Sequence, residues 1–293
     1  MDLATLFRHL LHLRRYRELR GERMPWKMRM PYYRNVVRHQ ALDGWPGGYI
    51  QRSDGRFAYV PSQVDVMAGY RLLKPLSPNA QVDLLCRSGD CVIDIGANIG
   101  DWTLAFALAA GKTGRVLAFE PVPHLAETVR KTARINRIDW VEVHELALSA
   151  TDGTSTFSVE HGNSGGSRLG TKSGDFSQIS VESRRLDSLV DERPDLTRID
   201  LVKVDVEGHE LEVLEGGRRT LARFRPPLIL ESGFEAGPQR VAQHDLLREL
   251  GYDIIGAFVT GGIIEIGWDD YRNRTGEVAR VGLCNYLFMP RTG

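Results

Sequence analysis

Four predicted strands end in carboxylate side chains. These side chains are Asp94, Glu120, the pair Asp205 and Glu207, and Glu231. In an open α/β sheet, ligands bind outside the carboxyl ends of the parallel strands. Carboxylates gathered at that edge would form a negative rim, which suits a cationic cofactor or a divalent metal ion.

A glycine-containing turn follows the first of these strands. The apolar run at 91–95 is followed by Gly96, Asn98 and Gly100, and then by a helical pattern. A dinucleotide fingerprint needs glycines at the positions held here by Asn98 and Asp101. The turn is therefore unsuited to a pyrophosphate, and a nicotinamide oxidoreductase is disfavoured. The alternative is that the turn needs glycine only for its geometry.

The ligand that fits this turn better is S-adenosylmethionine. Glu120 ends a second apolar run, at the place where an acidic residue binds the hydroxyls of a nucleotide ribose. S-adenosylmethionine has a ribose and no phosphate, and it carries a sulfonium cation. A pocket edged by Asp94 and Glu120 suits that charge.

Candidate catalytic residues follow the strand predicted at 199–204. Asp205 and Glu207 would share one face if the strand stays extended there. His209 would open the next helix, whose dipole keeps an imidazole neutral and able to accept a proton. The predicted catalytic residues are Asp205, Glu207 and His209. The alternative for His209 is that it only caps the helix or packs against it. In an alternative form, Asp205, Glu207 and Glu231 hold Mg²⁺.

The charge of the chain is unevenly distributed. The 293 residues carry no net charge, so there is no general case for nucleic-acid binding. Residues 1–40 nevertheless contain ten Lys or Arg and only three Asp or Glu. We divide the chain into a basic N-terminal extension at 1–60, with a helix and turns, and an S-adenosylmethionine-binding domain at 61–293.

The N-terminal extension contains an amphipathic pattern. Apolar residues recur at helical spacing over 3–19, opposite a basic face. Such a helix can dock on the catalytic domain or on a second copy in a homodimer. It can also lie on an anionic membrane, which would give peripheral contact through residues 1–24.

The cysteines and the hydropathy favour a reducing compartment. Cys86, Cys91 and Cys284 have neither a disulfide framework nor metal-ligand spacing. No apolar run reaches the roughly 18 residues of a membrane span, and no secretory cleavage site is evident. We expect a cytoplasmic protein, with a membrane-peripheral location as the alternative.

Strands and helices alternate along the chain, which predicts an α/β sheet with antiparallel strands near the carboxyl end. The ordered motifs resemble the FkbM-type S-adenosylmethionine-dependent methyltransferases. Those that carry the resemblance over about residues 85–290 are Asp94-Ile-Gly-Ala-Asn-Ile-Gly, Phe119-Glu-Pro, Leu146-Ala-Leu-Ser, Leu186-Asp-Ser-Leu, Ile199 to Glu210, Leu214-Glu-Gly, Pro227 to Glu231, Leu250-Gly-Tyr and Asn285-Tyr-Leu-Phe.

The resemblance implies a class I methyltransferase fold with a Rossmann-like, seven-stranded, mostly parallel sheet and an antiparallel last strand. It also implies that the cofactor is bound by Asp94, Gly96, Asn98, Gly100, Glu120 and Pro121. Members commonly methylate hydroxyls, so we expect O-methylation of a sugar, glycan or secondary metabolite. A catalytically silent binding module, held at a membrane or partner through its N-terminal helix, is the alternative. Residues 1–60 have no counterpart in the family pattern.

Overall fold

The computed structural model describes residues 47–51, 55–61, 79–160, 166–171, 176–233, 235, 237–259, 262–281 and 284–291. The helix predicted at 3–19 and the membrane contact through 1–24 lie outside these residues. No helix in the described part of the chain is long and apolar enough to cross a membrane.

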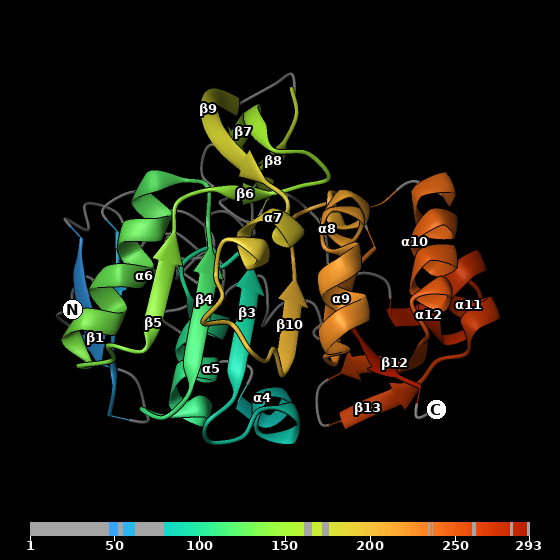
Figure 1. Cartoon of the computed structure of the whole chain (residues 1–293), viewed down its shortest axis with the longest axis horizontal. Helices are drawn as coiled ribbons and strands as arrows, with labels where there is room; N and C mark the ends of the chain where they lie inside the picture. The colour runs from blue at the N-terminus through green and yellow to red at the C-terminus, as the bar shows by residue number, and fades with distance from the viewer. Residues whose placement is uncertain are drawn as a thin grey trace, which may run out of the picture.

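A single large sheet of eight strands organises the fold (Figure 1). In spatial order, its strands are β13 (Gly262–Glu265), β12 (Tyr252–Val259), β14 (Cys284–Pro290), β11 (Leu228–Ser232), β10 (Leu201–Val204), β3 (Cys91–Ile95), β4 (Arg115–Phe119) and β5 (Val141–His144). Five neighbouring strands of this sheet, β5, β4, β3, β10 and β11, are parallel to one another. Strand β14 is antiparallel to β11. This is the predicted class I methyltransferase arrangement.

The eighth strand, β13, was not predicted. It pairs antiparallel with the end of β12 and extends that edge of the sheet. The two glycines at 261 and 262 predict a turn. The four residues of β13 show too little alternation of apolar and polar side chains to predict a strand. The seven-stranded prediction therefore describes the core of the sheet, to which one hairpin strand is added.

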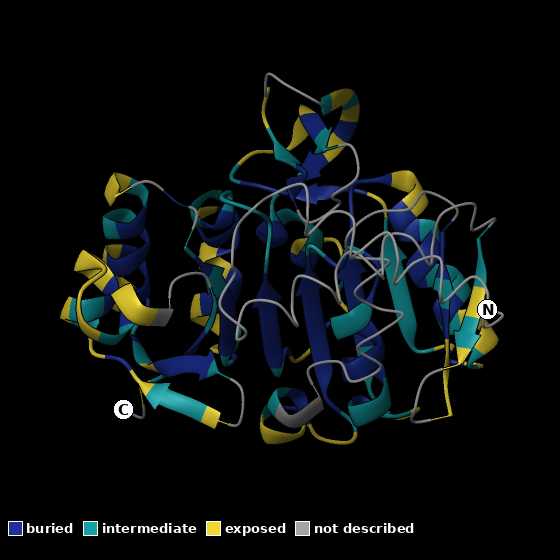
Figure 2. Cartoon of the chain, turned by 180° about the vertical axis from the view of Figure 1, so that it is seen from behind, coloured by how far each residue is buried: buried dark blue, intermediate teal, exposed yellow. Residues whose placement is uncertain are grey.

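Helices cover both faces of the sheet, and its central strands are buried (Figure 2). The helices are α4 (Asn79–Leu85), α5 (Asp101–Ala110), α6 (Pro123–Ile135), α7 (Leu186–Asp191), α8 (Glu210–Gly216), α9 (Arg218–Phe224), α10 (Gly237–Glu249), α11 (Trp268–Asn273) and α12 (Gly276–Val281). Strands buried on both sides read as continuous apolar runs, which is why they were recognisable in the sequence.

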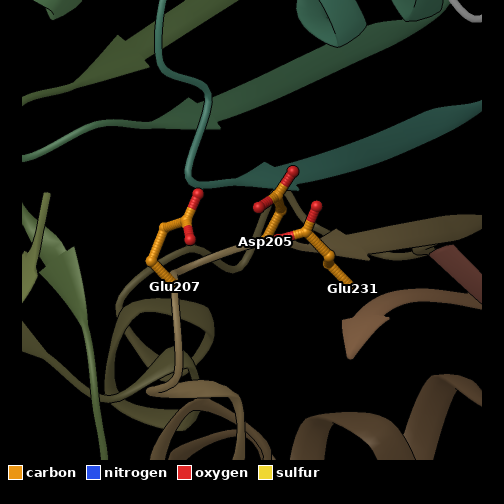
Figure 3. A group of neighbouring side chains, drawn as sticks. All are labelled: Asp205, Glu207 and Glu231. Atoms are coloured by element: carbon orange, nitrogen blue, oxygen red, sulfur yellow. The ribbon is translucent and has the colours of Figure 1, made fainter. Parts of the chain in front are cut away.

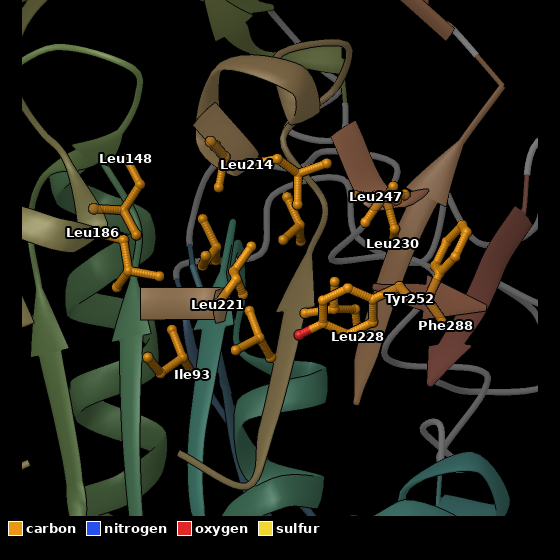
Figure 4. Close-up of a cluster of buried hydrophobic side chains, with 14 of the residues drawn as sticks. Ile93, Leu148, Leu186, Leu214, Leu221, Leu228, Leu230, Leu247, Tyr252 and Phe288 are labelled. Atoms are coloured by element: carbon orange, nitrogen blue, oxygen red, sulfur yellow. The ribbon is translucent and has the colours of Figure 1, made fainter. Parts of the chain in front are cut away.

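Alternate residues of the strands belong to two separate cores. One core packs Ile93, Leu228 and Leu230 against side chains of α7 to α10, including Leu221 and Leu247 (Figure 4). The other packs residues of opposite parity, such as Val92 and Ile229, against α4 and α5. The strand period of two therefore decides which helix each side chain meets.

A second sheet is inserted between β5 and β10. It comprises β6 (Ala147–Leu148), β9 (Phe176–Arg184), β7 (Gly153–Glu160) and β8 (Arg168–Leu169). Figure 1 shows it standing above the carboxyl ends of the parallel strands. Phe157 and Val181 pack on Ile99 and Val122, in the turns that follow β3 and β4. The alternation of polar and apolar residues at 156–159 predicts one short antiparallel strand, whereas the structure has a four-stranded sheet here.

A two-stranded sheet lies on α6. It consists of β1 (Gly48–Gln51) and β2 (Phe57–Val60), paired antiparallel. Tyr59 donates its backbone N–H to Thr132 Oγ1 at 3.0 Å, and Phe57 donates its own to Asn136 Oδ1 at 3.0 Å. Part of the predicted extension is thus hydrogen-bonded to the methyltransferase domain, while the boundary at residue 60 stays a prediction.

We predict that Gly96→Ala destabilises the protein by about 2 kcal/mol or more. A Cβ atom on Gly96 would lie 1.8 Å from the carbonyl oxygen of Asp205, and the residue has a left-handed φ of 81°. Gly237→Ala is the control, because nothing lies within 4 Å of a Cβ there. Urea denaturation measures both variants, and equal stabilities would contradict the close packing of the two turns.

Candidate active site

Three carboxylates meet at the carboxyl edge of the large sheet. Asp205 and Glu207 follow β10, and Glu231 lies in the neighbouring β11. One ligand atom from each lies within 4.8 Å of the others. Figure 3 shows the carboxylates of Asp205 and Glu231 side by side, with Glu207 reaching them from the following turn. Two adjacent parallel strands and one turn therefore build the acidic cluster.

The route by which Glu207 reaches the cluster differs from the prediction. An extended strand over Asp205 and Glu207 is wrong, because β10 ends at Val204. Glu207 has a left-handed φ of 57°, and Gly208 follows with a φ of 96°. The turn is closed by Glu210 Oε1, which accepts the backbone N–H of Gly208 at 3.0 Å. A left-handed turn, rather than strand alternation, thus brings the two carboxylates together.

A buried lysine, Lys203, supplies the positive charge beside this cluster. Its side chain is 1% exposed, and its Nζ lies 2.8 Å from Asp205 Oδ2. Lys203 pairs in register with Asp94 on β3, and its Nζ lies 5.2 Å from the ring centroid of Trp102. Burial would lower the pKa of Lys203, but the carboxylates of Asp205 and Asp94 outweigh it and raise the pKa.

Lys203 was not among the residues singled out from the sequence. The signal in the sequence that could have identified it is a lysine in the middle of the apolar run at 201–204. Lysine is almost never fully buried unless it is paired. A charged residue inside a buried strand therefore predicts a partner carboxylate, which here is Asp205.

Two of the three carboxyls in the cluster hold their protons strongly. Burial, together with the neighbouring Asp205, raises the pKa of Glu231 to about 10 and that of Glu207 to about 8. Glu231 shares a hydrogen bond with Asp205. At neutral pH and without a ligand, Glu231 and Glu207 are therefore mainly protonated. A cation that arrives beside them would favour their ionised forms.

Glu120 organises the predicted cofactor turn. Its Oε2 accepts the backbone N–H of Asn98 at 2.8 Å, and its Oε1 accepts that of Val122 at 2.9 Å. Burial raises the pKa of Glu120 to about 7. Asn98 has a left-handed φ of 51°, while Gly96 and Gly100 both have φ of 81°. Glu120 thus ties the ends of β3 and β4 together, with Pro121 directly after it.

Asp94 lies beneath the turn and not at its surface. The side chain is fully buried, and Asp94 Oδ2 accepts a hydrogen bond from Thr103 Oγ1 of α5 at 2.6 Å. Its Oδ1 has no hydrogen-bond partner in the described part of the chain. Asp94 therefore adds negative charge from below, and direct contact with a cofactor stays a prediction.

His209 stands directly before α8, as expected, and both of its ring nitrogens face protein groups. Nε2 lies 2.9 Å from Ser149 Oγ, and Nδ1 lies 3.4 Å from Glu212 Oε2. Burial lowers the pKa of His209, so the ring is neutral at physiological pH. The chain Ser149–His209–Glu212 connects the start of the inserted sheet to α8. His209 would have to give up a contact to accept a substrate proton, and its role as base stays a prediction.

The sequence model described as "Methyltransferase FkbM domain" matches residues 94–254, which include every candidate residue of the site. The chain belongs to this family. FkbM methyltransferases depend on S-adenosylmethionine, so that cofactor follows for this chain. The carboxylates at the edge of the sheet fit its sulfonium cation.

Curated relatives that match this chain are named as methyltransferases, and the chain spans from about half to three quarters of their length. Methyltransferase sdnD of Sordaria araneosa is 30% identical over 57% of this chain and 75% of that protein. The 2-O-methyltransferase NoeI of Sinorhizobium fredii is 31% identical over 49% of this chain and 64% of its own length. The hexuronic acid methyltransferase AglP of Haloferax volcanii is 31% identical, and the match spans 43% of this chain and 49% of AglP.

A solved structure of similar fold is that of the methyltransferase FkbM from Methylobacillus flagellatus. It is 15% identical, covers 88% of this chain and 60% of that chain, and has a TM-score of 0.43. The strand order described above carries the fold assignment for this chain.

We predict that the ligand-free protein becomes less stable as the pH rises from about 5 to 8. Free glutamates have a pKa near 4.3, whereas burial raises the pKa of Glu120 and Glu207 to about 7 and 8. The folded state therefore binds more protons than the unfolded state in this range, and stability falls with pH. Urea denaturation in the presence of a chelator measures the slope.

A glutamine variant tests the source of this slope. Glu231→Gln should flatten the dependence of stability on pH, because burial and Asp205 raise the pKa of Glu231 to about 10. Glu265→Gln, at an exposed position on β13, is the matched control and should leave the slope unchanged. Identical slopes in both variants would show that Glu231 does not hold the proton.

Proposed function

We propose that this protein transfers the methyl group of S-adenosylmethionine to a hydroxyl oxygen of a sugar, glycan or secondary metabolite. The observation that carries the proposal is the acidic cluster at the ends of β10 and β11, with Lys203 beside it. The cluster lies at the edge of the sheet where class I methyltransferases bind their ligands. It offers proton acceptors to an acceptor molecule placed there.

The chemistry requires a proton acceptor. S-adenosylmethionine supplies a methyl carbon that forms a bond to the acceptor oxygen as its bond to sulfur breaks, and the hydroxyl proton leaves. A hydroxyl is a poor nucleophile at neutral pH, so a positioned base accelerates the step. Asp205 and Glu207 hold carboxylate oxygens at the cluster and are the proposed bases.

The chain's own charges prepare these carboxylates. Lys203 Nζ holds Asp205 Oδ2 at 2.8 Å, which orients that side chain. Burial and Asp205 raise the pKa of Glu207 to about 8, so Glu207 is mainly protonated at neutral pH without a ligand. A cation bound at the acidic edge would favour the ionised form of Glu207. Cofactor binding and activation of Glu207 are therefore expected to be coupled.

Hydroxyl methylation is also supported by what the relatives are named for. One matched relative is a 2-O-methyltransferase, and another is a hexuronic acid methyltransferase. Both names describe those proteins, and each match spans less than two thirds of the relative. A sugar hydroxyl is accordingly the first acceptor class to test here.

A metal-assisted form of the reaction uses the same residues. Asp205, Glu207 and Glu231 offer only oxygen ligands, which suit Mg²⁺. The metal would supply charge that polarises the acceptor hydroxyl. However, Lys203 already provides a counter-charge to Asp205. Metal dependence is therefore the alternative form, and turnover that persists after thorough chelation would remove it.

We predict that S-adenosylhomocysteine binds the purified protein and that Glu120→Ala weakens this binding by about 10-fold or more. Charged hydrogen bonds of the kind that Glu120 would make to a ribose contribute about 1.5–3 kcal/mol. Isothermal titration calorimetry measures the affinity, with Glu127→Ala on α6 as the matched control. Binding of NADH in place of S-adenosylhomocysteine would overturn the methyltransferase proposal.

We predict that Asp205→Asn and Glu207→Gln each lower turnover by about 10²–10⁴-fold with little change in S-adenosylhomocysteine affinity. Transfer of labelled methyl to a panel of hexoses, hexuronic acids and glycolipids measures the activity. His209→Gln tests the other predicted base, whose ring nitrogens face Ser149 and Glu212 in the ligand-free structure.

The same assay distinguishes the alternatives. Full turnover in both carboxylate variants, with a large loss in His209→Gln, would assign the base to His209. Cofactor binding without transfer to any acceptor would favour a catalytically silent binding module.

A further inference from the structure

A patch of exposed hydrophobic side chains lies where β1 and β2 meet the end of α6. Tyr49, Phe57 and Ile135 are 44%, 39% and 43% exposed. Among the described residues, only two other large hydrophobic side chains are exposed. Phe57 lies beside the end of α6, because its N–H and C=O both bond to the Asn136 amide, at 3.0 and 2.6 Å. Tyr49 packs on Tyr59 of β2, with ring centroids 5.3 Å apart.

Cationic side chains surround this patch. Lys131 places its Nζ 4.1 Å from the ring centroid of Tyr59. Arg134 and Arg137 are exposed, and neither forms an ion pair within the described part of the chain. We call the set Tyr49, Phe57, Lys131, Arg134, Ile135 and Arg137 the α6 face.

A groove of about 540 Å³ lies between α6 and β5 and shares Arg134 and Arg137 with the α6 face. Arg130, Arg134 and Arg137 contribute to its lining, together with one carboxylate, Asp139. Arg130 is neutralised by Glu145, with Nη1 and Oε2 3.1 Å apart. Arg134 and Arg137 therefore outnumber the one remaining carboxylate, Asp139, and an anionic group complements the net positive charge of the groove.

The N-terminal part of the sequence is also basic. Residues 1–40 carry ten Lys or Arg against three Asp or Glu, and they lead into β1, which begins at Gly48. A basic segment cannot neutralise Arg134 and Arg137. The partner that complements both the segment and the α6 face is therefore anionic, and it must also accept exposed aromatic and aliphatic side chains.

We propose that the α6 face is a docking surface for a membrane that contains anionic phospholipids. Lys and Arg near such a surface attract the phosphate-bearing headgroups, while aromatic and aliphatic side chains enter the interfacial region. Nucleic acid would complement the charge but leave Ile135 without a matching apolar environment. The combination of cations with exposed Tyr49, Phe57 and Ile135 therefore favours a lipid surface.

The α6 face is separate from the acidic cluster. The helix begins at Pro123, just after the carboxyl end of β4, and runs back toward the opposite edge of the sheet (Figure 1). Arg134 and Arg137 are thus near the amino ends of the strands, where β5 begins at Val141. Changes there leave the proposed active site untouched, so failure of either proposal can be told from failure of the other.

Co-sedimentation of the full chain with vesicles tests the proposal. We expect binding to phosphatidylcholine vesicles that contain about 30% phosphatidylglycerol, and little binding to phosphatidylcholine alone. The double variant Arg134→Glu/Arg137→Glu should bind at least about 10-fold more weakly, since each basic residue contributes about 1 kcal/mol. Phe57→Ser should weaken binding to the same vesicles without changing its salt dependence.

Arg272→Glu is the matched control, because Arg272 is an exposed arginine on α11, away from α6. It should bind anionic vesicles as the unchanged chain does, and thermal unfolding verifies that all variants are folded. The proposal is overturned if the unchanged chain ignores anionic vesicles or if the double variant binds them normally. It is also overturned if the double variant loses only binding to an RNA oligomer, or only self-association seen by light scattering.

Discussion

The ion pair between Lys203 and Asp205 is the interaction on which the proposed active site depends. Both charges lie at the end of a central strand, and the lysine side chain is 1% exposed. Removing one member of such a pair leaves an uncompensated buried charge, which typically costs about 3–5 kcal/mol. The pair therefore places a carboxylate at the carboxyl edge in a fixed orientation, beneath the region where a ligand binds.

This pair also explains the unequal behaviour of the surrounding carboxyls. Lys203 pairs with Asp205 rather than with the other two carboxyls. Burial and Asp205 outweigh the charges of Arg168 and Lys203 at Glu207 and raise its pKa to about 8, and they raise the pKa of Glu231 to about 10. In the ligand-free site, Glu207 and Glu231 are therefore mainly protonated at neutral pH. The sulfonium group of S-adenosylmethionine is a cation, and its binding would draw these acids toward their ionised forms.

The two additions to the methyltransferase core lie at different places. The inserted sheet β6–β9 stands over the carboxyl ends of the parallel strands and packs on the turns after β3 and β4. The small sheet β1–β2 lies on α6 and contributes to the proposed membrane-docking face. One addition thus stands over the proposed active site, and the other belongs to the proposed docking face.

The sequence by itself determined the central strands of the large sheet, their acidic ends and the family. Apolar runs such as 91–95 are strand signals because parallel strands are buried on both faces, and the order of the motifs specified the methyltransferase fold. Only the tertiary structure decided which charges meet. Strand register sets Lys203 opposite Asp94, β11 brings Glu231 to Asp205, and His209 contacts Ser149 across sixty positions. Local patterns encode each strand, whereas these contacts depend on how distant strands and turns align, which no local pattern contains.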